Sequence, residues 1–248
     1  MNVSLDDQGK FLPLEDSNRK SIEFIGDSIT SGEGLRGAVS QMEWIPPFFA
    51  ASRSYAAMVA RKLDANFSVM SQCGWGLKWS WDGFSEFSIP PHYKNVCSVI
   101  EGDFQKSLGA HEIYDFANGF DAVVINLGTN DNSALRLENP TCTDSLENRE
   151  IFMQTGIDFL KEIRKYNPSA IILWCYGMIK LDKVPSLIEN LVEVYKKETG
   201  DKKVFSMQLD SMEELELCEE DKGSRGHPGP KTHLCAAKKI TAFLQNFL

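Results

Sequence analysis

The sequence lacks the features that mark two large classes of protein. None of its apolar runs approaches the roughly 20 residues that a membrane-spanning helix needs. No basic stripe stands out either, in a chain whose 35 acidic and 26 basic residues give a formal net charge of −9. These absences argue against a membrane and against nucleic acid as partners. No pattern in the sequence fixes the oligomeric state.

The cysteines show no pairing pattern. All six are scattered and none forms a Cys-x-x-Cys motif. Cys175 falls in an expected buried strand and Cys235 on a helix face, where free thiols behave as small hydrophobic side chains. We therefore expect reduced cysteines rather than a disulfide framework. The first seven residues also lack the basic and apolar regions of a secretory signal. Together these features favour a cytoplasmic location.

Signatures of metal and cofactor binding are missing as well. The four histidines lack the short spacings that bind zinc. The glycines of Ser31-Gly32-Glu33-Gly34 are not followed by the lysine of a phosphate-binding loop. We expect neither a metal ion nor an organic cofactor.

Short apolar runs alternate with helical patterns along the 248 residues, a length that suits one large α/β domain. Five runs rich in Val, Ile and Phe are typical of buried parallel strands: 22–25, 67–71, 122–127, 170–176 and 204–209. Helical periodicity covers 54–63, 150–166, 187–197 and 232–247. This alternation predicts a three-layer α/β/α sandwich with a five-stranded parallel sheet of flavodoxin-like order.

Two segments fall outside the alternation. Residues 1–20 are polar and aperiodic, so we expect them to be linker-like and residues 21–248 to form the domain. Residues 72–118 are long, aromatic and poor in periodicity. A loop of that length in a compact domain is usually functional or partly structured.

Three polar loops adjoin these elements. The run 22–25 ends in Gly26-Asp27-Ser28, which sets a hydroxyl at the carboxyl end of a strand, where α/β folds place their chemistry. Asn130 follows the run 122–127, and His227 precedes the last helix. A serine needs a base to become a nucleophile, and a histidine is mostly neutral at pH 7. The pattern predicts Ser28 as nucleophile and His227 as its base, with Asp27 as a loop-stabilising acceptor.

At these residues the chain resembles the SGNH (GDSL) hydrolases. Ser28 matches the nucleophile block, Gly74 the glycine block, Asn130 the Gly-x-Asn-Asp block and His227 the His-Pro block, in the family's order. The sequences of residues 22–30 and 73–77 are most similar to those of carbohydrate esterases of family 2, which deacetylate sugars.

The resemblance implies an SGNH hydrolase fold and an oxyanion hole. Its donors would be the main-chain N–H groups of Ser28 and Gly74 and the side-chain amide of Asn130. From spacing alone Gly74 could equally be a turn glycine, and the Asn130 side chain could equally form an Asx turn. Residues 9–14 are similar to the linker that often follows an accessory β-sandwich in this family, so we expect a single-domain form or a fragment.

The sequence departs from the family at the third member of the triad. Ser224 stands where an aspartate is usual, three residues before His227. Such an acid fixes the imidazole tautomer and stabilises the imidazolium. A carbonyl of the 223–226 loop could hold the tautomer and give a Ser-His dyad, or the site could be impaired. A carboxylate could also come from elsewhere, with candidates at Asp210, Glu220 and Asp221. We favour the dyad.

The tryptophans bear on the substrate. Trp75, Trp79 and Trp81 follow Gly74, and Trp44 precedes a Pro-Pro-Phe-Phe run. Flat aromatic rims suit sugar rings, although a hydrophobic cluster under the long loop explains the same pattern equally well.

The leading hypothesis is a serine esterase that removes acetyl or other short acyl groups from an acylated carbohydrate through an acyl-enzyme. The alternatives are a lipid or thioester acyl hydrolase with the same machinery, and a catalytically impaired glycan-binding module.

Overall fold

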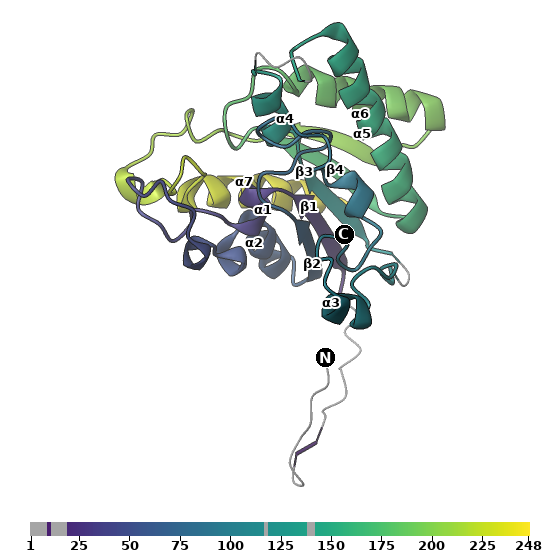
Figure 1. The fold of residues 1–248 in the computed structure, drawn as a ribbon, viewed down its shortest axis with the longest axis horizontal. Helices are drawn as coiled ribbons and strands as arrows, with labels where there is room; N and C mark the ends of the chain where they lie inside the picture. The colour runs from purple at the N-terminus through teal and green to yellow at the C-terminus, as the bar shows by residue number, and fades with distance from the viewer. Residues whose placement is uncertain (1–8, 11–18, 117–118, 138–141) are drawn as a thin grey trace.

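A computed structural model describes residues 9–10, 19–116, 119–137 and 142–248, and the chain is built around one parallel sheet (Figure 1). The strand order is β2-β1-β3-β4-β5, with every neighbouring pair parallel. The strands are β1 Ser21–Gly26, β2 Asn66–Ser71, β3 Ala122–Asn126, β4 Ile171–Tyr176 and β5 Val204–Gln208. This is the flavodoxin-like order, so the predicted fold is confirmed.

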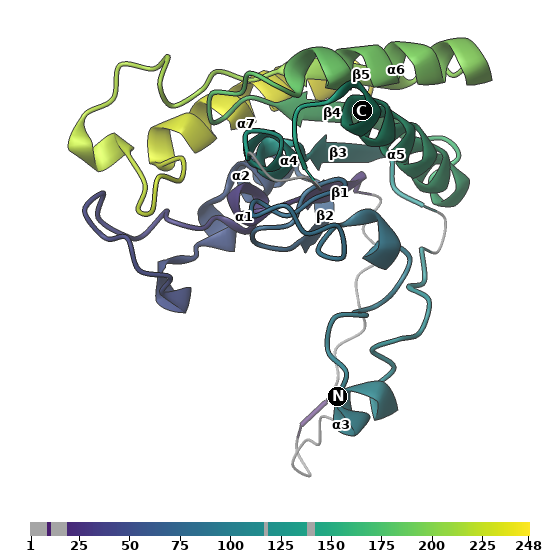
Figure 2. The same ribbon diagram turned by 45° about the horizontal axis from the view of Figure 1, so that its top comes forward.

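Helices cover both faces of the sheet (Figures 1 and 2). The α-helices are α1 Ser28–Ser31, α2 Tyr55–Lys62, α3 Asp103–Ser107, α4 Thr129–Ala134, α5 Leu146–Tyr166, α6 Pro185–Thr199 and α7 Pro230–Leu244. Single 3-10 turns occur at Pro46–Phe48, Ala51–Arg53, Pro90–His92 and Glu219–Asp221. Helices α2 and α7 pack together on one face, and α5 and α6 on the other. Within the described chain, no helix has both the length and the apolar character needed to cross a bilayer.

The two cores meet in the central strands. Successive side chains of a strand point to opposite faces. Accordingly Val123 and Ile125 belong to the core under α5 and α6, whereas Ala122 and Val124 belong to the core under α2 and α7. All four are fully buried, as expected for a strand covered by helices on both sides.

Two expectations about these elements need correction. The run 67–71 does form a strand, but β2 lies at the edge of the sheet, so Phe67 is 47% and Val69 37% exposed rather than buried. Helix α5 starts at Leu146, about a turn before the predicted residue 150. The earlier start follows from its cap, because the Ser145 side chain accepts the Asn148 N–H.

The long segment after β2 is partly structured, as predicted, and the part that carries α3 extends away from the sheet (Figure 2). A buried polar network ties it to the sheet. The Tyr93 hydroxyl donates to Glu23 Oε2 over 2.8 Å, and Asn167 Nδ2 donates to the Tyr93 oxygen over 2.9 Å. Of the segment predicted to be a linker, residues 1–8 and 11–18 lie outside the described residues.

A Glu23→Gln variant is expected to stabilise the fold at alkaline pH. Burial raises the pKa of Glu23 from 4.5 to about 7. Its contribution to stability is therefore fully present below pH 4.5 and is lost as the pH rises through about 7. Glutamine keeps an acceptor for Tyr93 without the buried charge, so urea unfolding at pH 8 should show a gain of up to about 3 kcal/mol. The gain should nearly vanish at acidic pH; an equal gain at both pH values would contradict this explanation.

Candidate active site

Ser28 and His227 meet at the carboxyl edge of the sheet. Ser28 follows β1 directly, and His227 lies in the loop before α7. The His227 Nε2 atom lies 2.9 Å from Ser28 Oγ, and Nδ1 lies 3.1 Å from the carbonyl oxygen of Arg225. Because a carbonyl only accepts, Nδ1 must hold the proton, which leaves the Nε2 lone pair directed at the Ser28 hydroxyl. The imidazole is thus in the tautomer that can remove the proton of Ser28.

The turn that presents Ser28 is fixed by Asp27. Its Oδ1 accepts the Ile29 N–H over 2.9 Å and caps α1, and its Oδ2 accepts from Asn130 Nδ2 over 3.1 Å. The carboxyl is 1% exposed, and burial raises its pKa to about 7. Asp27 is therefore a structural acceptor, as predicted, and it links the turn of Ser28 to the start of α4.

The three predicted oxyanion donors surround one space. The main-chain N–H groups of Ser28 and Gly74 find no acceptor among the described residues, so both remain available to a ligand. Gly74 has a φ of +77°, and a Cβ there would lie 3.1 Å from Trp81 Cδ1, so a side chain would be strained. Asn130 Nδ2 differs, because it already donates to the Trp75 carbonyl over 2.8 Å as well as to Asp27. It would have to share a hydrogen with a substrate oxygen.

Asp131 fixes the loop that carries Gly74, a role the sequence analysis missed. Its buried carboxylate accepts the main-chain N–H groups of Leu77, Lys78 and Trp79 over 2.7, 2.7 and 2.9 Å. One side chain on α4 thus holds three consecutive residues of the long loop. The position of the glycine donor depends on it.

A cavity of about 370 Å³ opens over the dyad. It is lined by Ser28, Ile29, Glu33, Trp44, Cys73, Gly74, Trp81, Thr129, Asn130, Ser133, Ile179, Arg225, Gly226 and His227. Trp44 and Trp81 belong to this lining and are 56% and 60% exposed.

The other two tryptophans predicted to contact sugar do not line the cavity. Trp79 is 3% exposed and belongs to the core under α5 and α6, so its indole has no face left for a ligand. Trp75 packs against His92 and Phe87, with ring centroids 4.9 and 5.9 Å apart. The expectation for Trp79 is therefore wrong, and Trp81 alone of the three borders the cavity.

Carboxylates proposed to orient His227 are engaged elsewhere. Asp210 pairs with Lys239 over 3.4 Å, and Asp221 pairs with Lys231 over 3.5 Å. Glu220 has an exposed side chain, and in the described chain the imidazole contacts Ser28, Arg225 and Glu33 instead.

The carboxylate beside the imidazole is instead Glu33. Its Oε2 lies 3.6 Å from His227 Nε2, and its side chain is 5% exposed. Burial lowers the pKa of His227, and the charge of Glu33 opposes that shift. In the sequence, Glu33 stands out only within Ser31-Gly32-Glu33-Gly34, which lacks the lysine of a phosphate-binding loop. The sequence signal for this turn is the pair of glycines on either side of Glu33. In the structure Gly32 and Gly34 have φ of +75° and +80° and form a tight turn after the nucleophile.

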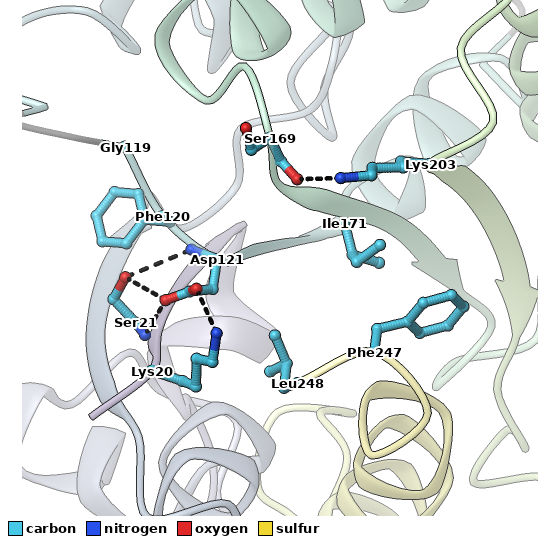
Figure 3. A pocket seen from close by; sticks show the side chains of 10 residues that line it. All are labelled: Lys20, Ser21, Gly119, Phe120, Asp121, Ser169, Ile171, Lys203, Phe247 and Leu248. Carbon is cyan, nitrogen blue, oxygen red and sulfur yellow. Dashed lines mark hydrogen bonds and ion pairs between the residues drawn. The ribbon is translucent and has the colours of Figure 1, made fainter. Parts of the chain in front are cut away.

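A larger cavity of about 670 Å³ lies at the opposite edge of the sheet, where the strands begin (Figure 3). Its charged groups are already partnered. Lys20 Nζ lies 3.0 Å from Asp121 Oδ1, and Lys203 Nζ donates to the Ser169 carbonyl over 3.0 Å. The Ser21 hydroxyl donates to Asp121 Oδ2 over 3.2 Å, and the lining contains no histidine that could act as a base. Nor do any three His, Cys, Asp or Glu side chains in the described ranges form a group that could hold a metal ion.

Known proteins were compared with this chain. No protein-family model matches it. Cellulase/esterase CelE of Acetivibrio thermocellus is 29% identical over 251 residues, which covers 97% of this chain and 27% of that protein. An acetyl xylan esterase from the rumen bacterium Butyrivibrio proteoclasticus superposes with a TM-score of 0.84 at 37% identity, covering 96% of this chain and 65% of its own. A family two carbohydrate esterase from Clostridium thermocellum, solved with cellohexaose, gives 0.72 at 28% identity, covering 96% and 66%.

The architecture places the chain in the α/β class, with a five-stranded parallel sheet, and it superposes on these relatives over nearly its whole length. Its homologues are carbohydrate esterases, including members of family 2, and the resemblance predicted from the motifs is confirmed. The chain spans 27% of the length of the first of these relatives and about two thirds of the two solved chains.

Proposed function

We propose that the protein is a serine esterase that removes acetyl or other short acyl groups from an acylated carbohydrate. The observation that carries this proposal is the 2.9 Å contact between Ser28 Oγ and the unprotonated Nε2 of His227. The contact lies beside two main-chain donors that have no acceptor in the described part of the chain, in a cavity bordered by exposed tryptophans.

In the proposed reaction Ser28 Oγ attacks the ester carbonyl while His227 Nε2 takes the hydroxyl proton. The negative oxygen of the tetrahedral intermediate is bound by the N–H groups of Ser28 and Gly74, with Asn130 as third donor. One such donor typically contributes about 2.7–4 kcal/mol to transition-state stabilisation. His227 then gives its proton to the sugar oxygen, which leaves an acyl-enzyme. Water attacks that ester with His227 again as base, and the acid and free Ser28 are released.

The substrate class follows from the border of the cavity. Trp44 and Trp81 line the cavity and are more than half exposed, and an indole ring has flat apolar faces on which a sugar ring can stack. Seven of the other twelve lining residues are polar or charged, which suits a sugar ester better than a fatty acyl chain. A relative was solved with cellohexaose, and another is named an acetyl xylan esterase. We therefore propose an acetylated oligosaccharide as substrate; a cytoplasmic location stays a prediction.

Two measurements test the function. A fluorophosphonate probe should label Ser28 alone by peptide mass spectrometry, and the protein should release acetate from acetylated xylo-oligosaccharides. Acetyl esters of p-nitrophenol should react faster than octanoyl esters. Faster octanoyl hydrolysis would favour the lipid or thioester hydrolase, and sugar binding without turnover would favour the impaired glycan-binding module.

Truncation of the border tryptophans is expected to weaken binding of the sugar part of the substrate. Trp44→Ala and Trp81→Ala should each raise KM for an acetylated oligosaccharide about 3- to 10-fold, because one aromatic contact contributes roughly 0.5–1.5 kcal/mol. KM for p-nitrophenyl acetate, which has no sugar, should change less than about twofold. Phe104→Ala removes an aromatic ring that is 69% exposed on α3 and serves as the matched control. Equal effects on both substrates would argue against stacking.

A further inference from the structure

The dyad raises the question of what replaces the acid of a triad. The Arg225 carbonyl fixes the tautomer of His227, but a carbonyl has no full charge with which to stabilise the imidazolium. Arg225 itself has a φ of +55°, a left-handed conformation that costs energy for a residue with a side chain. Such a conformation persists only where the surroundings enforce it. Something must therefore hold Arg225 in the orientation that aims its carbonyl at Nδ1.

Two contacts hold Arg225: its main-chain N–H donates to the Gln41 carbonyl over 3.0 Å, and its side chain is held by Glu33. The Arg225 guanidinium forms an ion pair with Glu33 Oε1, between residues 192 positions apart in the sequence. Main-chain bonds support the pair: the Ser224 N–H donates to the Gly34 carbonyl over 3.1 Å, and the Glu33 N–H donates to the Ser28 carbonyl over 2.9 Å. Glu33 is thus bonded through its main chain to Ser28 and through its side chain to the loop that carries His227.

The second carboxylate oxygen of Glu33 faces the imidazole. Oε2 lies 3.6 Å from Nε2, the atom that becomes protonated when Ser28 attacks. The ionisable groups that act on His227 are Glu33, Arg225 and the fully buried His233. Only Glu33 among them carries negative charge. An opposite charge within about 4–6 Å favours the charged form of a group by roughly 1–3 pKa units.

We propose that Glu33 is the positioning residue that replaces the missing triad acid. One oxygen fixes Arg225, so that the Arg225 carbonyl holds Nδ1–H, and the other places negative charge beside the imidazolium that forms at Nε2. This inference rests on the proposed esterase reaction and assigns the orientation of its base to a residue of the nucleophile's own turn.

Glu33→Gln separates charge from shape, because glutamine keeps the size and an acceptor for Arg225 but loses the charge. We expect kcat to fall about 10- to 100-fold with KM changed less than twofold. Without the negative charge the imidazolium is less stable, so the titration midpoint of His227, followed by NMR, should move to lower pH by about one unit or more. The acid limb of kcat/KM should move with it. Unchanged kcat and midpoint would overturn the proposal.

Arg225→Met tests the first part of the proposal, that Glu33 positions the Arg225 carbonyl. Loss of the positive charge should raise the midpoint of His227, yet kcat should still fall about 10-fold because only the main-chain bond to Gln41 then orients the carbonyl. An unchanged or higher kcat would refute positioning through Arg225. A fall in kcat of Glu33→Gln with no shift in midpoint would refute the charge role.

Asp221→Asn is the matched control, since that carboxylate pairs with Lys231 and should change neither readout. Thermal unfolding of each variant reports whether it is folded. The NMR titration needs no substrate, so absence of esterase activity in the unchanged protein would count against the proposed function while the role of Glu33 is still decided by the midpoints.

Discussion

Ser28→Ala and His227→Ala are each expected to reduce ester hydrolysis by about 10⁴- to 10⁶-fold while the protein stays folded. Without Oγ no acyl-enzyme forms, and without Nε2 the hydroxyl keeps its proton during attack. Because the two groups act as one unit across a 2.9 Å contact, the double variant should be no slower than either single variant. Initial rates with p-nitrophenyl acetate measure this directly.

The controls for the dyad distinguish chemistry from structure. His111→Ala removes a histidine whose side chain is 34% exposed and should leave the rate unchanged. Fluorophosphonate labelling should disappear in Ser28→Ala and slow strongly in His227→Ala. A Ser28→Ala variant with activity within about tenfold of the unchanged protein would place the reaction elsewhere in the molecule.

Asp131→Ala is expected to cost about 3 kcal/mol or more of unfolding free energy and most of the activity. The carboxylate is the acceptor for three main-chain N–H groups, and an unpaired buried donor costs roughly 1–3 kcal/mol. The loop they belong to also carries Gly74, so the oxyanion hole should lose its shape. Urea unfolding and kcat for p-nitrophenyl acetate give the two effects separately.

Asp131→Asn sharpens the test of this loop. The amide oxygen can keep the two bonds made by Oδ1, to Lys78 and Trp79, but its NH₂ group then faces the Leu77 N–H, donor against donor. The loss should therefore lie between that of alanine and the unchanged protein, at about 1–3 kcal/mol. Asp158→Ala, at a side chain 62% exposed on α5, should stay within about 0.5 kcal/mol. If asparagine were as stable as aspartate, hydrogen-bond acceptance by the carboxylate would not be what orders the loop.

The sequence was sufficient to predict the elements and the meeting of Ser28 with His227. Both follow from local patterns, because strand ends and turn residues are encoded over a few positions and a parallel sheet gathers its carboxyl ends at one edge. Exposure was harder to predict. A strand at the edge and one in the centre have similar apolar runs, so the exposure of Phe67 was not foreseen.

Other features depended on contacts between distant segments. Trp79 and Trp81 are two positions apart in the same loop, and only the packing of that loop decides that the first is in the core and the second at the cavity. The pairing of Glu33 with Arg225 joins residues 192 positions apart, and no local pattern links the turn after Ser28 to the 223–226 loop. Spacing predicts which groups reach the edge of the sheet, but not which side chains hold them in place.

The packing of Ser224 constrains how this site could change in evolution or design. Its side chain is 1% exposed, and it fits against Gly37 so closely that a Cβ at Gly37 would lie 2.3 Å from Ser224 Oγ. An aspartate introduced at this position alone would have to bury a longer, charged side chain in that space. The segment around Gly37 would therefore have to move or change before an aspartate at position 224 could complete a triad. Replacing Ser224 with aspartate alone is not expected to create one.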